Sequence, residues 1–177
     1  MIKVAVIGLV LFTVTVLMIS PSSSPSAPAE PGVWEFGDYV IRIQNPSLQS
    51  LTQFNEKSTE KGLIIELYSD EELEPIMLEY NTNCKAIIHF LKQGFDEEFS
   101  KYKHLIIVVP RENCYEVAES DSHFVINITV FKEPKIVDED ENLYNFTVDK
   151  SFTIKIPFSV LFNNSESSLD SVGVVSV

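Results

Sequence analysis

The stretch from Asn83 to Cys114 places the tightest constraint on the fold, because it joins two cysteines through a mainly apolar run. Cys84 and Cys114 are the only cysteines in the chain and lie thirty positions apart. An even pair of cysteines in an exported chain most simply forms one bridge. We therefore predict a Cys84–Cys114 disulfide, which would stabilise the fold by about 3–4 kcal/mol. Free or intermolecular thiols are the alternative.

Two elements are expected between these cysteines. Apolar residues at steps of three and four predict an amphipathic helix over residues 84–102, with Gly94 as its weak point at a cost of about 1 kcal/mol against alanine. The run His104–Pro110 is rich in β-branched residues and too short for a second helix, so it predicts a strand buried on both faces. This helix and this strand together would form the core.

Most of the remaining chain carries strand patterns. Gly37 and Asp38 suit a two-residue hairpin turn between apolar segments, with one long bulged strand as the alternative. Further strands are expected at 62–68, 75–80, 123–131, 143–148 and 151–160, where apolar and polar residues alternate or apolar residues run together. We predict an α+β fold: six to eight mostly antiparallel strands in a sheet or sandwich, with the helix of about 84–102 packed on it.

The ends of the chain differ in composition from its middle. An apolar segment follows Lys3, which predicts a signal peptide over 1–20 that is cleaved between 20 and 29; a retained signal anchor, with the domain outside the cell, is the alternative. Residues 21–31 are rich in proline and serine and predict an extended linker. One disulfide-stapled domain is expected over 32–162, and a flexible polar tail over 163–177.

The charge of the chain restricts its partners. It contains 26 acidic and 13 basic residues, and loss of Lys3 with the leader would leave 12 basic residues. Such an excess of negative charge argues against nucleic acid and anionic membrane surfaces as partners. No membrane span is expected in the mature chain, because the apolar tail is far too short for one.

Three sequons predict N-glycosylation at Asn127, Asn145 and Asn163. The alternation of the two strands that carry Asn127 and Asn145 places both asparagines on outward faces. A glycan attached there would leave the core undisturbed.

Metal and cofactor signatures are weak. Asp138, Asp140 and Asn142 place oxygen donors at alternate positions, which could supply some of the about six to eight ligands that calcium takes, but the glycine and the distal glutamate of a helix-loop-helix calcium site are absent. A solvated acidic loop is the better interpretation. The three histidines, at 89, 104 and 123, are not at metal-ligand spacing and are expected at the surface or at its boundary. We expect no cofactor.

Catalytic patterns are also absent from the sequence. It contains no Gly-x-Ser-x-Gly turn and no glycine-rich phosphate loop, and the acid pair Glu97-Glu98 lies in charged, solvated surroundings. An active site assembled from distant residues is the less favoured alternative.

These observations favour a secreted, glycosylated, non-catalytic module that binds an extracellular protein or cell-surface partner through its strand faces or loops. The alternative is a carrier of a small apolar ligand in a cavity of about 300 Å³ or more between sheet and helix. That cavity would be lined by Trp34, Ile87, Leu91, Ile154 and Phe158.

Overall fold

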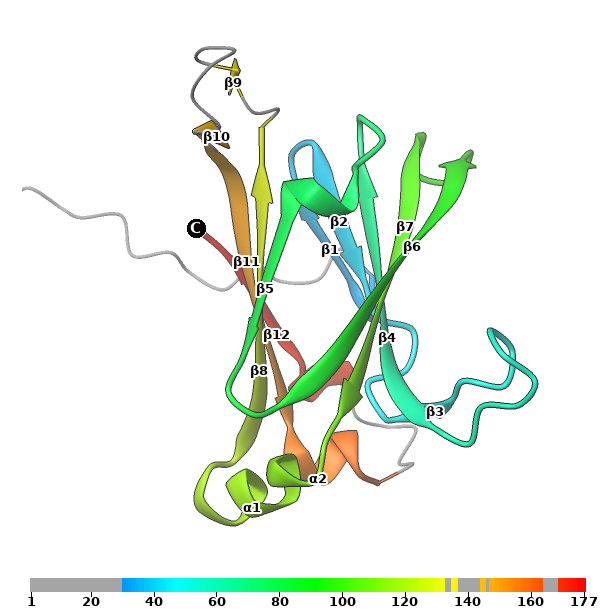
Figure 1. Cartoon of the computed structure of the whole chain (residues 1–177), viewed down its shortest axis with the longest axis vertical. Helices are drawn as coiled ribbons and strands as arrows, with labels where there is room; N and C mark the ends of the chain where they lie inside the picture. The colour runs from blue at the N-terminus through cyan, green and yellow to red at the C-terminus, as the bar shows by residue number, and fades with distance from the viewer. Residues whose placement is uncertain (1–29, 133–134, 137–143, 146, 164–168) are drawn as a thin grey trace, which may run out of the picture.

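Two antiparallel sheets pack face to face as a β-sandwich (Figure 1). The structure is a computed structural model that describes residues 30–132, 135–136, 144–145, 147–163 and 169–177. The prediction of a mostly antiparallel β fold is confirmed. Six and four strands form the two sheets, more than the six to eight strands expected.

The six-stranded sheet has the order β1-β2-β4-β7-β6, and β3 pairs with the beginning of β4. Its strands are β1 (Val33–Phe36), β2 (Tyr39–Arg42), β3 (Gln49–Ser50), β4 (Lys61–Ser69), β6 (Ala86–Asp96) and β7 (Lys101–Pro110).

The four-stranded sheet has the order β12-β11-β8-β5. Its strands are β5 (Leu78–Thr82), β8 (His123–Phe131), β11 (Val148–Pro157) and β12 (Gly173–Ser176). Two short strands, β9 (Lys135–Ile136) and β10 (Tyr144–Asn145), pair with each other.

Helical segments are short and lie between strands. The helices α1 (Asn113–Ser120) and α2 (Phe158–Leu161) lie together at one end of the sandwich, at the bottom of Figure 1. Two 3₁₀ turns, η1 (Pro75–Met77) and η2 (Leu169–Ser171), precede β5 and β12.

The core lies between the sheets and follows the alternation of the strands. Along β8, every second side chain is fully buried, as the period of two predicts. The four-stranded sheet contributes Phe124, Ile126, Ile128, Val130, Phe152, Ile154 and Ile156. The six-stranded sheet contributes Ile41, Leu63, Ile65, Leu67, Ile106 and Val108. The hairpin at Gly37 is confirmed: Phe36 pairs with Tyr39, and Gly37 has a φ of +69°.

The predicted helix over 84–102 is wrong, because this stretch forms β6, a turn and the beginning of β7. The apolar residues of this stretch recur at steps of three and four, but they also occupy every second position from Ala86 to Phe90. This alternation turns Ala86, Ile88 and Phe90 toward the core. Gly94, expected as the weak point of a helix, lies at a register shift with a φ of +116°, where glycine relieves the strain of a bulge. The one main helix is α1.

The C-terminal residues are also more ordered than predicted. Within the expected tail, Gly173–Ser176 form β12, which pairs with β11 and buries Val174 completely. Four residues are too few for alternation to identify a strand from sequence. Conversely, the predicted strand over 151–160 ends at Pro157, and Phe158–Leu161 turn into α2.

The predicted disulfide between Cys84 and Cys114 is present. It joins the residue two positions before β6 to the first turn of α1, and both cysteines are buried. The bridge therefore fastens α1 to an edge strand of the six-stranded sheet, across a 30-residue separation that contains the whole β6–β7 hairpin.

One histidine lies where the sequence did not predict it. His104, expected at the surface or its boundary, is fully buried, whereas His89 is exposed and His123 half-buried, as predicted. The Leu73 N–H donates to Nε2 of His104 at 3.0 Å, and Nδ1 lies 3.3 Å from the Leu67 carbonyl oxygen. Nε2 is therefore an acceptor and the ring is neutral. The segment around Leu73 folds over the ring, and this burial lowers the pKa of His104.

We predict that His104 makes the domain less stable in mild acid. Because its pKa lies below the ordinary value of about 6.5, the unfolded chain takes up a proton before the folded one does. The stabilising contribution is complete above about pH 6.5 and is lost as the pH falls through the lowered folded pKa. Urea unfolding between about pH 7.5 and 5 should show this decline in the wild type and a smaller one in His104→Gln, which cannot titrate.

The matched control is His89→Gln, since His89 is exposed. This variant should keep the wild-type pH dependence. Equal slopes in wild type and His104→Gln would contradict the assignment.

Candidate functional site

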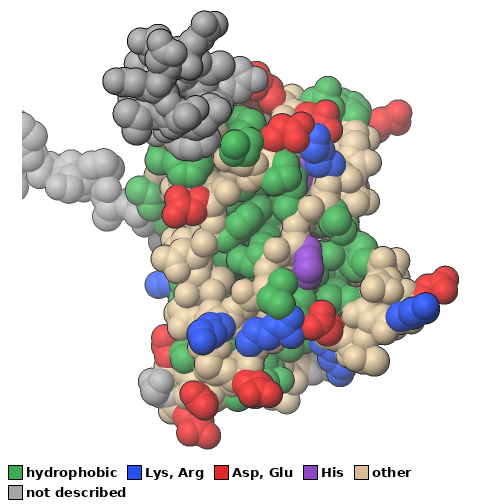
Figure 2. Space-filling view, viewed as in Figure 1, with side chains coloured by type: hydrophobic (Ala, Val, Ile, Leu, Met, Phe, Trp, Pro, Cys, Tyr) green, Lys and Arg blue, Asp and Glu red, His purple; other side chains and the backbone are tan. Residues whose placement is uncertain are grey.

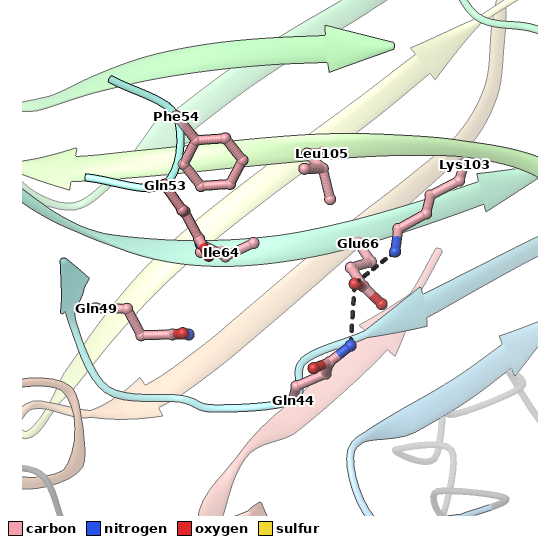
Figure 3. Close-up of a pocket in the computed structure, with 8 residues that line it drawn as sticks. All are labelled: Gln44, Gln49, Gln53, Phe54, Ile64, Glu66, Lys103 and Leu105. Atoms are coloured by element: carbon pink, nitrogen blue, oxygen red, sulfur yellow. Dashed lines mark hydrogen bonds and ion pairs between the residues drawn. The ribbon is translucent and has the colours of Figure 1, made fainter. Parts of the chain in front are cut away.

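A pocket of about 340 Å³ opens on the outer face of the six-stranded sheet, on the side away from the four-stranded sheet (Figure 3). Polar side chains, apolar side chains and one aromatic ring line it. The lining residues are Gln44, Gln49, Gln53, Phe54, Ile64, Glu66, Lys103 and Leu105.

The floor of the pocket comes from the two central strands of the sheet. Ile64 and Glu66 are two apart on β4, and Lys103 and Leu105 are two apart on β7, so each pair lies on one face of its strand. Glu66 is directly opposite Leu105 in the β4–β7 register. Strand alternation and register therefore bring a carboxylate, an ammonium group and two aliphatic side chains together.

The rim of the pocket is the segment 43–60, which Figure 1 shows outside β4. Leu51 anchors this segment by packing on Ile107 and Val109 in a separate small cluster on the outer face. The Phe54 N–H then donates to the Leu51 carbonyl at 3.0 Å, which holds the ring of Phe54 beside the floor. Figure 3 shows Gln53 extending toward Ile64, and the amide of Gln49 pointing toward Gln44.

Glu66 is the electrostatic centre of the site and is only 7% exposed. Its Oε1 pairs with the Lys103 ammonium at 2.8 Å and accepts a hydrogen bond from the Gln44 amide at 3.1 Å. Its Oε2 accepts from the Tyr68 hydroxyl at 2.9 Å and lies 3.6 Å from Nε of Arg42. Four donors therefore replace the water that the buried carboxylate has lost.

A second set of contacts surrounds these donors. The Arg42 guanidinium pairs with the exposed Glu98 at 3.4 Å and lies 5.6 Å from the centre of the Phe99 ring. Lys103 lies 5.8 Å from the centre of the Tyr68 ring. Burial and the hydrogen bond to Glu66 raise the pKa of the Tyr68 phenol, so it stays a neutral donor.

We call Arg42, Glu66, Glu98 and Lys103 the charge cluster. It contains two cations and two carboxylates, so it is neutral as a whole.

This geometry suits binding better than proton transfer. Each oxygen of Glu66 already accepts from at least one positioned donor, so the carboxylate is held within the charge cluster and is not presented to a substrate. The hydrogen-bonding capacity that remains belongs to the glutamine amides. Gln53 has no partner within the described residues, and Gln49 has a single long contact of 3.4 Å to the Asn45 carbonyl.

The residues predicted from the sequence lie elsewhere. Asn127 is on the outer face of the four-stranded sheet, where its Oδ1 accepts from the Thr153 hydroxyl at 2.7 Å, and Asn163 is exposed just after α2. Asn145 is in β10, and its side chain lies outside the described part of the structure. Glycosylation at all three remains a prediction. Asp138, Asp140 and Asn142 are outside the described residues.

No group of three or more His, Cys, Asp and Glu side chains in the described ranges is placed to hold a metal ion. In the same part of the chain, no helix has the length and apolar character that crossing a membrane requires.

The residues expected to line a carrier cavity do not come together. Trp34, Ile154 and Phe158 belong to the main core, whereas Leu91 packs in the outer cluster with Leu51, and Ile87 is 40% exposed on β6. None of the eight pocket residues was predicted as a site residue. The one signal available was Glu66, a lone acid within the apolar run Gly62–Tyr68.

The chain matches none of the family models, curated proteins or solved structures with which it was compared.

We predict that Glu66→Gln lowers the free energy of unfolding by about 2–3 kcal/mol, because it takes from Lys103 the carboxylate that pairs with it, leaves Arg42 with the exposed Glu98 alone, and turns an amide donor toward other donors. The control is Glu98→Gln, which removes the 64%-exposed carboxylate of the same charge cluster and should cost less than about 1 kcal/mol. Urea denaturation of both variants measures the difference. Equal losses would show that Glu66 is not the centre of the cluster.

Proposed function

We propose that this protein is a secreted, N-glycosylated, non-catalytic binding module that recognises an extracellular protein or cell-surface partner through the pocket above Glu66. The observation that carries the proposal is the pocket itself, in which unengaged amides and a half-exposed ring surround an open space over a neutral, fully paired charge cluster. A convergent set of polar groups in a concavity is the usual form of a binding site.

The pocket is held in place before any ligand arrives. Glu66 fixes the side chains of Lys103 and Gln44, and Leu51 fixes the segment that carries Gln53 and Phe54. Side chains that are already ordered lose little conformational entropy on binding, and this favours affinity.

The proposed compartment agrees with the chemistry of the chain. The Cys84–Cys114 disulfide is typical of oxidising, extracytoplasmic environments, and the apolar leader predicts export. The excess of acidic residues argues against nucleic acid as the partner.

The predicted glycan positions support the pocket face as the binding face. Asn127 is central in the four-stranded sheet, between Asn81 of β5 and Thr153 of β11. A glycan at Asn127 would cover the outer face of that sheet and leave the opposite outer face, with the pocket, uncovered. Unshielded surface is where a partner can approach.

Substitution of Phe54 tests the proposal. Phe54 is 39% exposed in the pocket, so Phe54→Ala should preserve the fold and weaken binding of the fluorescently labelled mature protein to partner-bearing cells by at least about tenfold. Titration on cells that bind the wild type gives the apparent Kd.

The control is Phe95→Ala, which removes another exposed phenylalanine, at the far end of β6 and outside the pocket. It should bind like the wild type. Equal losses for the two variants would move the binding face away from the pocket, and no loss for either would contradict the proposal.

A carrier of a small apolar ligand is the second candidate, and one observation favours it. The cavity first expected for it needed a helix at 84–102, which is absent, but apolar side chains also gather between β5 and β6 on the face shown in Figure 2. The hydroxyl of Tyr80, which is in β5 and packs against the main core, is shielded from solvent without a hydrogen-bond partner in the described residues. A bound ligand with an acceptor atom would satisfy it.

Tyr80→Phe separates the two candidates. If the seam between β5 and β6 is empty in the functional protein, as the binding-module proposal implies, loss of an unsatisfied hydroxyl should raise the free energy of unfolding by about 1 kcal/mol. Cell binding should not change. Native mass spectrometry that shows a small molecule bound to the wild type and lost from Tyr80→Phe would instead favour the carrier.

A further inference from the structure

The pocket above Glu66 has two walls of opposite character. Phe54, Ile64 and Leu105 form an apolar wall, and Figure 3 shows these three side chains on the same side of the pocket. Gln44 and Gln49 supply primary amides on the other side, and Gln53 adds a third amide beside Ile64. A matching ligand has one apolar face and a dense set of hydrogen-bonding groups at its edge.

The charges of the pocket disfavour an ionic ligand. An anion would compete with Glu66 for Lys103 while lying beside the Glu66 carboxylate, and a cation would meet Lys103 and Arg42. The charge cluster is neutral, and the chain as a whole is strongly negative, which further disfavours anions. The ligand group in the pocket is therefore expected to be uncharged.

The polar groups that remain free match hydroxyls. A primary amide offers an acceptor oxygen and two N–H donors, and a hydroxyl also both donates and accepts. Gln53 and Gln49 can therefore serve neighbouring hydroxyls as donors and acceptors, and Gln44, whose amide nitrogen already donates to Glu66, can add its amide oxygen as an acceptor. The half-exposed Phe54 ring supplies the flat apolar surface on which the C–H face of a sugar ring can lie.

The size of the pocket sets the length of the recognised unit. At about 340 Å³ it is near the lower end of the range for ligand pockets, about 300–1,000 Å³. This space holds one or two pyranose rings, and a longer chain would extend into solvent.

We propose that the pocket binds the terminal, uncharged sugar unit of an extracellular glycan, with Phe54 against its C–H face and the three glutamines on its hydroxyls. This inference rests on the proposed function and names the ligand class of the same site. The glycan can be carried by a protein or by a lipid, because the sugar chemistry is the same in both.

A glycan array tests the ligand class with the full mature protein. The probes are oligosaccharides that end in galactose, mannose or N-acetylglucosamine, together with sialylated and sulfated forms of each. We expect binding to at least one uncharged probe, at least tenfold weaker binding to its charged forms, and a loss of at least tenfold in Phe54→Ala and Gln53→Ala. Phe95→Ala is the control and should retain binding.

Gln53 and Phe54 are both exposed, so their substitution should leave the fold intact. The ¹H–¹⁵N spectra of the variants check this. Sugar binding that survives both pocket substitutions would overturn the inference. So would a preference for the charged probes.

The same experiment separates this inference from the proposed function. If no sugar binds but cell binding still depends on Phe54, the ligand class is wrong and the binding module stands. If neither depends on Phe54, both are wrong. Binding to vesicles that carry a neutral glycolipid, compared with binding to cells whose N-glycans have been removed enzymatically, distinguishes a lipid source from a protein source.

Discussion

The burial of one carboxylate organises the outer face of the six-stranded sheet. Glu66 lies on a central strand among apolar neighbours, and a carboxylate removed from water must find donors close by. Those donors come from β2, β4, β7 and the segment after β2, so four parts of the chain are tied to one point. Because each charged side chain of the charge cluster is paired with one of opposite sign, the pocket beside it offers polar groups without an unpaired charge. The character of the pocket is thus a consequence of how Glu66 is compensated.

The two outer faces of the sandwich have different roles in this interpretation. On the six-stranded sheet, the segment 43–60 covers part of the face and leaves a concavity beside the charge cluster. On the four-stranded sheet, Asn81, Asn127 and Thr153 align across three strands in a small polar row, which includes a sequon. A face with a polar row and a predicted glycan suits shielding, and a face with a pocket and unengaged amides suits recognition.

Sequence reasoning was sufficient where one local pattern decided the structure. Period-two alternation identified β8, the glycine turn identified the first hairpin, and cysteine count identified the disulfide. The sequence prediction failed at 84–102 because β6 is an edge strand with apolar residues on both faces, so its apolar residues also recur at the helical steps of three and four. Only the pairing of this segment with β7 distinguishes a strand from a helix. The pocket could not be predicted from the sequence for a related reason. Glu66, Lys103 and Arg42 are distant in sequence, and only the register of the paired strands brings them together. Glu66 within an apolar run was visible, but its partners were not.

The most direct test of the central claim is to observe the glutamine side-chain amides themselves. In a ¹H–¹⁵N spectrum of the mature protein, the NH₂ resonances of Gln44, Gln49 and Gln53 report on the pocket, and those of Asn81 and Asn127 report on the opposite sheet. Addition of soluble glycan released from cells that bind the protein should shift the three glutamine resonances and leave the two asparagine resonances in place. Shifts confined to the asparagines, or to the seam between β5 and β6, would contradict a binding site above Glu66.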